Sequence, residues 1–164
     1  MTCLVELERE KLPIEEVPSS SSSSSKASPS KKKGKPLFEE EWSRIYPGEL
    51  VITFFYFPTA TNKRIATSTI KGIYYRKQDN IPTIGDTKNW GMTFSPCWWA
   101  CDMKRKWRVN ALDAAQKGTA YYDVVIDCAE STMKGFTTAN LRELRTVLRH
   151  QCKPDVIVKE GFPW

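Results

Sequence analysis

Aromatic residues are confined to one part of this chain, and their distribution sets the limits of any folded core. All six tryptophans, all six tyrosines and all seven phenylalanines lie after residue 37. Residues 19–25 are seven consecutive serines, and the basic run 31–35 (KKKGK) follows. A segment of this composition buries too little apolar surface to offset the entropy lost on ordering. We therefore predict a disordered Ser/Lys-rich tail over residues 1–36 and a core built from the remainder.

Charge and hydropathy limit where such a chain can work. The formal net charge is +6. No apolar run approaches the roughly 20 residues that a transmembrane helix needs. Residues 1–12 alternate Glu with Leu and hold no continuous apolar stretch, which does not fit the pattern of a secretory signal. We expect a cytoplasmic protein that associates with membranes, if at all, at their surface.

The cysteines do not form a metal-binding pattern. They are odd in number and irregularly spaced, at Cys3, Cys97, Cys101, Cys128 and Cys152. A structural zinc site typically needs four ligands in two close pairs, and only Cys97 and Cys101 come near such a pair. We expect free thiols, no metal and no cofactor.

Short segments rich in β-branched and aromatic residues follow one another through the domain. Residues 49–57 (ELVITFFYF) predict the clearest strand. Further strands are predicted at 63–67, 70–76, 90–94, 97–103 and 121–128. Residues 104–109 either continue the strand at 97–103 or form another short strand. The adjacent Trp98 and Trp99 must point to opposite faces of a strand, so we expect one in the core and the other toward solvent, a ligand or a partner.

One amphipathic helix is predicted after the strands, over residues 137–151. Its apolar stripe consists of Leu141, Leu144, Val147 and Leu148. Thr137 is the predicted N-cap, with Phe136 and Leu141 as a hydrophobic staple, and Pro154 ends the helix. The opposite side carries Arg142, Arg145 and Arg149, which we interpret as a solvated face.

The order of six or seven strands followed by one helix resembles that of pleckstrin-homology-like domains, including their GRAM-like and bacterial-type branches. Three local patterns carry the resemblance, namely residues 65–73 (IATSTIKGI), 88–91 (KNWG), and 122–126 followed by 134–151. The resemblance covers roughly residues 45–152. It implies a bent antiparallel sheet or partly open barrel capped by the helix. We assign 37–154 to this domain and 155–164 to a C-terminal tail, and leave open whether that tail adds a strand.

In pleckstrin-homology domains, the turn after the first strand holds basic residues that bind inositol phosphates. The resemblance therefore implies ligand contacts by Lys63 and Arg64, with Lys71 as a further donor. The family pattern ends in a spaced arginine that this chain lacks, which argues against stereospecific recognition of one phosphoinositide.

A second basic segment combines four cations with an aromatic ring. It consists of Lys104, Arg105, Lys106, Trp107 and Arg108. Lysine and arginine side chains bind phosphates, while a tryptophan lies at the level of lipid headgroups or stacks on a nucleic-acid base. This segment therefore fits an anionic membrane surface or a nucleic acid, and a solvated turn with a half-buried tryptophan remains the alternative.

No pattern of catalytic residues stands out. The single histidine, His150, lies in the last turn of the helix, where a cation interacts favourably with the helix dipole. Asp123 and Asp127 flank one strand, and we interpret them as solvated acids. The sequence thus predicts a non-catalytic module that docks to anionic phospholipids or to a protein through Lys63, Arg64, Lys71 and residues 104–108. A nucleic-acid-binding protein that uses the same patches is the alternative.

Overall fold

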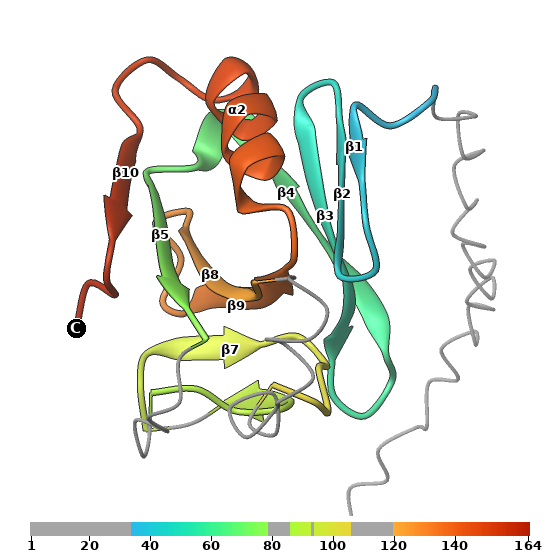
Figure 1. Ribbon diagram of the computed structural model, residues 1–164, viewed down its shortest axis with the longest axis vertical. Helices are drawn as coiled ribbons and strands as arrows, with labels where there is room; N and C mark the ends of the chain where they lie inside the picture. The colour runs from blue at the N-terminus through green and yellow to red at the C-terminus, as the bar shows by residue number, and fades with distance from the viewer. Residues whose placement is uncertain (1–33, 79–85, 93, 106–119) are drawn as a thin grey trace, which may run out of the picture. The chain divides into compact units, whose positions relative to one another are not determined.

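The computed structural model describes residues 34–78, 86–92, 94–105 and 120–164 (Figure 1). These residues form two β-sheets, with ten strands between them, and one α-helix close to the C-terminus. The prediction of a mainly β domain with a single C-terminal helix is confirmed, and no barrel closes among the described residues. Most of the predicted disordered tail, residues 1–33, lies outside the described ranges.

The first sheet is an antiparallel meander of four strands. Its strands are β1 (Phe38–Glu39), β2 (Ser43–Tyr46), β3 (Glu49–Tyr56) and β4 (Thr61–Ala66), in that order. β3 and β4 match two predicted strands. The sequence analysis missed β1 and β2, because runs of two and four residues are too short to show a period-2 pattern.

The second sheet has six strands in the order β10-β5-β8-β9-β7-β6. These strands are β10 (Ile157–Glu160), β5 (Gly72–Lys77), β8 (Tyr122–Asp127), β9 (Met133–Thr138), β7 (Cys97–Trp99) and β6 (Gly91–Met92). Two pairs are parallel, β7 with β9 and β10 with β5, whereas the resemblance implied antiparallel pairing throughout. Parallel neighbours need a long connection, and each of these pairs is separated in sequence by at least one other strand. The C-terminal segment therefore adds a strand to the sheet.

The helix α2 (Leu141–Gln151) begins later than predicted. Thr137 is not its N-cap, because residues 133–138 form β9 and pair with β8. The N-cap is Asn140, whose side chain accepts a hydrogen bond from the Glu143 backbone N–H. Between β4 and β5, a short 3-10 helix η1 (Thr67–Thr69) takes the place of the predicted break.

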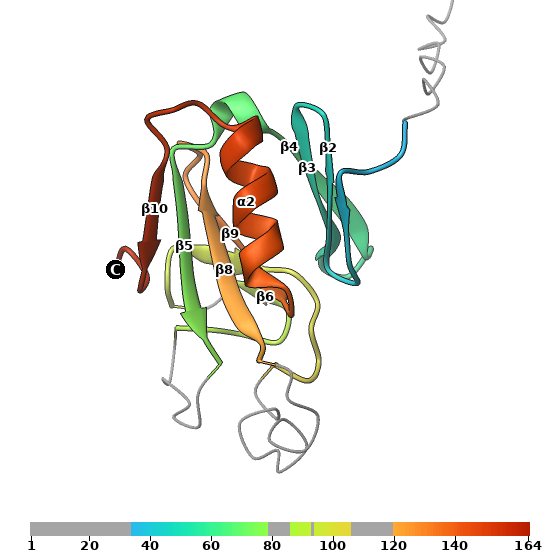
Figure 2. The same cartoon turned by 45° about the horizontal axis from the view of Figure 1, so that its top comes forward.

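The main core draws its residues from both sheets and from α2. Figure 2 shows α2 lying between the two sheets. Leu144 and Leu148 are fully buried there, beside residues of β3, β5 and β8. A second, smaller cluster covers the other face of the six-stranded sheet, and Trp99 is its largest member. A Cβ atom on Gly135 of β9 would lie 2.4 Å from the Trp99 ring, so this close approach requires glycine.

The expectation for the tryptophan pair is therefore only half met. Trp98 and Trp99 do point to opposite faces, but neither is turned to open solvent. Trp98 packs against the main core and donates from Nε1 to the Phe55 carbonyl oxygen at 2.9 Å. Trp99 is covered by Phe162, which follows β10, with ring centroids 5.9 Å apart. Phe162 reaches Trp99 because β10 joins the sheet. The residues around Trp99 in the sequence therefore do not indicate that Phe162 covers its ring.

Candidate functional site

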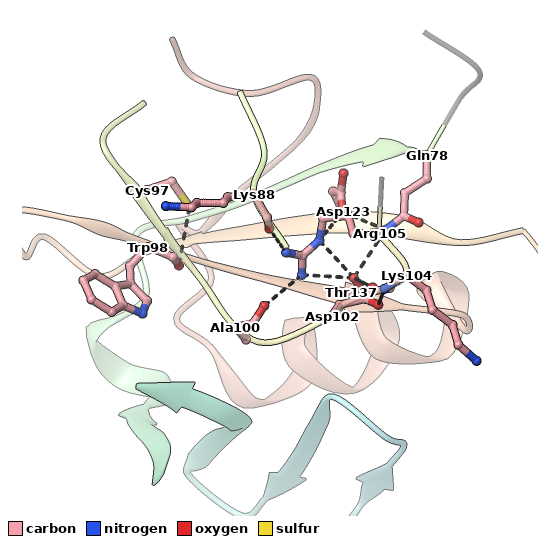
Figure 3. Close-up of polar contacts among 10 residues, drawn as sticks. All are labelled: Gln78, Lys88, Cys97, Trp98, Ala100, Asp102, Lys104, Arg105, Asp123 and Thr137. Atoms are coloured by element: carbon pink, nitrogen blue, oxygen red, sulfur yellow. Dashed lines mark hydrogen bonds and ion pairs between the residues drawn. The ribbon is translucent and has the colours of Figure 1, made fainter. Parts of the chain in front are cut away.

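Arg105, predicted to contact a ligand, is buried (Figure 3). Its Nε lies 3.1 Å from Asp123 Oδ1, and its Nη2 donates to the Thr137 hydroxyl at 3.1 Å and to the Ala100 carbonyl at 3.2 Å. Nη1 donates to the Lys88 carbonyl oxygen, and the guanidinium lies 4.7 Å from the centre of a Trp99 ring. The prediction for Arg105 was wrong, because its charge is satisfied inside the protein.

The partner of Arg105 also corrects an expectation. Asp123 is not a solvated acid but a buried residue of β8. Burial raises the pKa of its carboxyl above the ordinary value, opposed by the charge of Arg105 and by a 2.8 Å hydrogen bond from Gln78 Nε2. Thr137 completes the group, since its hydroxyl donates to Asp102 Oδ2 at 2.6 Å. The cluster ties the loop after β7 to β8 and β9, which is a structural role.

The basic residues of β4 also have acidic partners. Lys63 Nζ lies 3.1 Å from Glu130 Oε2, and Arg64 Nη1 lies 3.1 Å from Glu49 Oε2. Burial opposes the charge of Lys63, but Glu130 and Tyr56 outweigh it and raise the pKa of Lys63. Glu130 is shared with Lys134, a buried lysine of β9 whose Nζ lies 2.7 Å away. These ion pairs leave Lys63 and Arg64 poorly placed as a phosphate site.

Acid should weaken the fold through Glu130. The pKa of Glu130 is lowered to about 2, mainly because Lys134 donates a hydrogen bond to its carboxylate. Burial acts in the opposite direction, and a hydrogen bond from Lys63 lowers the pKa further. A carboxyl whose pKa is depressed in the folded state stabilises it above the unfolded pKa of about 4.5. This contribution is lost as the pH falls from about 4.5 to about 2. In urea unfolding, the free energy of unfolding of Glu130→Gln should therefore be lower than that of the wild type at pH 7. This difference should disappear as the pH falls from about 4.5 to about 2. A difference that does not depend on pH would contradict the assignment.

Two of the remaining predicted residues, Lys71 and Lys104, lie within the described ranges. Lys71 is exposed beside η1, next to the start of β5. Lys104 is exposed in the turn after β7, and with Phe54 and Met103 it lines a depression of about 380 Å³. Lys106, Trp107 and Arg108 lie outside the described residues. Of the predicted basic residues that the structure describes and that are exposed, Lys71 and Lys104 therefore lie beside different elements.

A surface that the sequence analysis did not single out lies around the hairpin between β3 and β4. We call it the aromatic tip; its members are Phe54, Tyr56, Phe57, Met92 and Met103. All five are exposed, and they account for five of the nine large exposed hydrophobic residues in the described chain. A cluster of exposed apolar residues near one hairpin is a candidate interaction surface.

Several contacts hold the aromatic tip together. The Phe57 and Trp90 rings meet edge to face at 5.1 Å, and Trp90 Nε1 donates to the Phe55 carbonyl oxygen at 3.1 Å. The Cys101 backbone N–H donates to the Phe54 carbonyl at 3.0 Å, which brings the Met103 turn alongside β3. Met92 pairs with Trp98 in the register of β6 and β7, and Trp98 packs on Phe55. In Figure 1 the hairpin and the β6–β7 region lie at the same end of the domain.

Phe54 has a backbone conformation that few non-glycine residues adopt. Its φ is +48°, at a register irregularity in the pairing of β3 with β4 between Ile52 and Tyr56. Its N–H donates to the Asn62 side chain at 3.2 Å. The irregularity leaves Phe54 51% exposed while the next residue, Phe55, is buried. Strain of this kind concentrates at functional sites, where the surrounding structure maintains it.

The aromatic tip had a sequence signal. Residues 54–57 (FFYF) are four consecutive aromatics within one strand pattern, and alternation must place about half of them on the outer face. The pattern is weaker than a cluster of cations as a sign of a binding surface, because a run of aromatics is equally typical of a buried strand.

The described residues show neither a metal site nor a membrane span. Among these residues, no group of three or more histidine, cysteine, aspartate or glutamate side chains is placed to bind a metal ion. The same part of the chain holds no helix with the length and apolar character that crossing a bilayer requires. Its four cysteines are free thiols. Comparison with protein-family models, with curated proteins and with solved structures finds no match for this chain.

Proposed function

We propose that this chain is a non-catalytic docking module that binds anionic phospholipid surfaces through the aromatic tip. The observation that carries the proposal is the cluster of exposed aromatic and methionine side chains on a hairpin held in a strained conformation. The resemblance of residues 45–152 to pleckstrin-homology-like domains adds support, because it implies a docking role.

The chemistry of the aromatic tip favours a lipid surface. Burying a phenylalanine or methionine side chain contributes about 1.5–3 kcal/mol, so insertion of two rings supplies useful affinity. The exposed Lys88 and Lys104 flank the apolar residues, and each lysine near an anionic surface adds about 1 kcal/mol. The overall charge of +6 attracts the chain to the same surface. Attraction followed by shallow insertion is the mechanism we infer.

Vesicle sedimentation tests this proposal directly. The wild-type chain should sediment with vesicles of phosphatidylcholine and phosphatidylserine at low salt, and far less with phosphatidylcholine alone. The double variant Phe54→Asn/Phe57→Ser should lose roughly tenfold or more in apparent affinity, because two inserting rings are gone. Asparagine is chosen at residue 54 because it tolerates positive φ.

The control is Ile157→Ser, which removes an exposed apolar side chain from β10 and should bind as wild type does. Unfolding curves of all variants establish that they are folded. Equal sedimentation of wild type with neutral and anionic vesicles, or unchanged binding by the double variant, would overturn the proposal. Retention of single-stranded RNA on filters without vesicle binding would favour the nucleic-acid alternative instead.

A further inference from the structure

A groove among the described residues lies beside α2 and is lined by arginines. It has a volume of about 690 Å³. Three of its lining residues, Arg142, Arg145 and Arg149, come from α2, while Tyr122 of β8 and Val158 of β10 line it from the sheet. Figure 2 shows α2 lying along this sheet, with β10 at the sheet's edge. The solvated face of the predicted helix thus forms the wall of a groove.

The three arginines form a row of fixed spacing. They stand at positions i, i+3 and i+7, which face the same side of a helix and span about 10 Å at 1.5 Å per residue. On the opposite side, Leu144 and Leu148 anchor the helix in the core, so the row cannot rotate away from the groove. Arg145 lies 4.6 Å from the centre of the Tyr75 ring, a stacking contact that orients its guanidinium.

No acidic residue in the described ranges forms an ion pair with any of these three arginines, in contrast to Arg64, Arg76 and Arg105. Glu143, on the same helix, is engaged with the N-cap Asn140. Neighbouring like charges on a helix repel each other, so the row is destabilising unless an anion shares it. The groove therefore concentrates positive charge that the described residues do not neutralise.

We propose that this groove binds a soluble compound that carries two or more phosphate groups. Guanidinium groups bind phosphate oxygens through paired hydrogen bonds, and one phosphate cannot span a row of about 10 Å. A soluble ligand is favoured because of the groove's position. The Gln151 side chain at the end of α2 accepts a hydrogen bond from the Gly48 N–H, just before β3, whereas the aromatic tip lies at the other end of that eight-residue strand.

Calorimetric titration of the full chain with tripolyphosphate tests the proposal, with phosphate and sulfate compared at equal ionic strength. Tripolyphosphate should bind at one site and about tenfold or more tightly than phosphate, since it engages several guanidiniums. Arg145→Ala/Arg149→Ala should weaken its binding by about tenfold or more. Arg145→Lys should also weaken it, because an ammonium lacks the planar fork.

Arg64→Ala is the matched control, since it removes one exposed positive charge from β4 and should leave the affinity unchanged. Arg149→Glu, at an exposed position, serves as a second variant if the double variant fails to fold. Equal binding of all anions, or unchanged affinity in the folded groove variants, would overturn the proposal. Failure of tripolyphosphate to bind the wild-type chain would also overturn it. The titration contains no vesicles, so its outcome is independent of the aromatic tip.

Discussion

Replacing Arg105 with alanine is expected to destabilise the domain by about 3–5 kcal/mol. The side chain is 1% exposed and pairs with Asp123, which is itself buried. Removing the guanidinium leaves a carboxylate in the interior without its ion-pair partner, and also removes donors from the Ala100 carbonyl and the Thr137 hydroxyl. Urea unfolding followed by tryptophan fluorescence measures the loss.

Two controls separate this effect from general sensitivity of the loop. Lys104→Ala changes the exposed neighbour and should shift stability by less than about 0.5 kcal/mol. Arg105→Met/Asp123→Leu removes both charges and should cost less than Arg105→Ala alone, because the Asp123 carboxylate is no longer left buried without its partner. A loss below about 1 kcal/mol for Arg105→Ala, as expected of a solvent-exposed ion pair, would contradict the buried ion pair with Asp123.

Leu144→Ala should cost about 2–5 kcal/mol. Leu144 is fully buried between the helix and the two sheets, so truncation removes apolar contacts and leaves a cavity. Thermal or urea unfolding measures the change. Thr146→Ala, two residues along on the exposed side of α2, is the control and should stay within about 0.5 kcal/mol. If both variants behave alike, the apolar stripe of α2 does not seat in the core.

Most of the fold could be predicted from local patterns. The strands β3, β4, β5 and β8 appear where β-branched and aromatic residues cluster, and α2 appears where leucines recur at helical spacing. β9 was missed because residues 133–138 (MKGFTT) contain glycine and a buried lysine, neither typical of a central strand. β10 was left open because four residues carry too little periodicity to decide.

The candidate site was predicted far less well, and Arg105 shows why. Five adjacent residues rich in cations indicate a solvated segment, since lysine and arginine are almost never buried unless paired. The partner of Arg105, Asp123, lies on a different strand, and no local pattern connects the two. Lys63 poses the same problem, since its partner Glu130 lies 67 residues along the chain. The arginines of α2 were assigned to the right side of the helix, but β10 was needed to turn that side into a groove.

By itself, the sequence determined which part of the chain holds the core and predicted the segments that become β3, β4, β5, β8 and α2, because periodicity depends only on neighbours along the chain. The tertiary structure alone decided which charges are neutralised, which aromatics stay exposed and where a groove opens. Those properties depend on contacts between residues far apart in sequence, such as Arg105 with Asp123 and Trp99 with Phe162. The burial of a charge is favourable only when such a partner is in place.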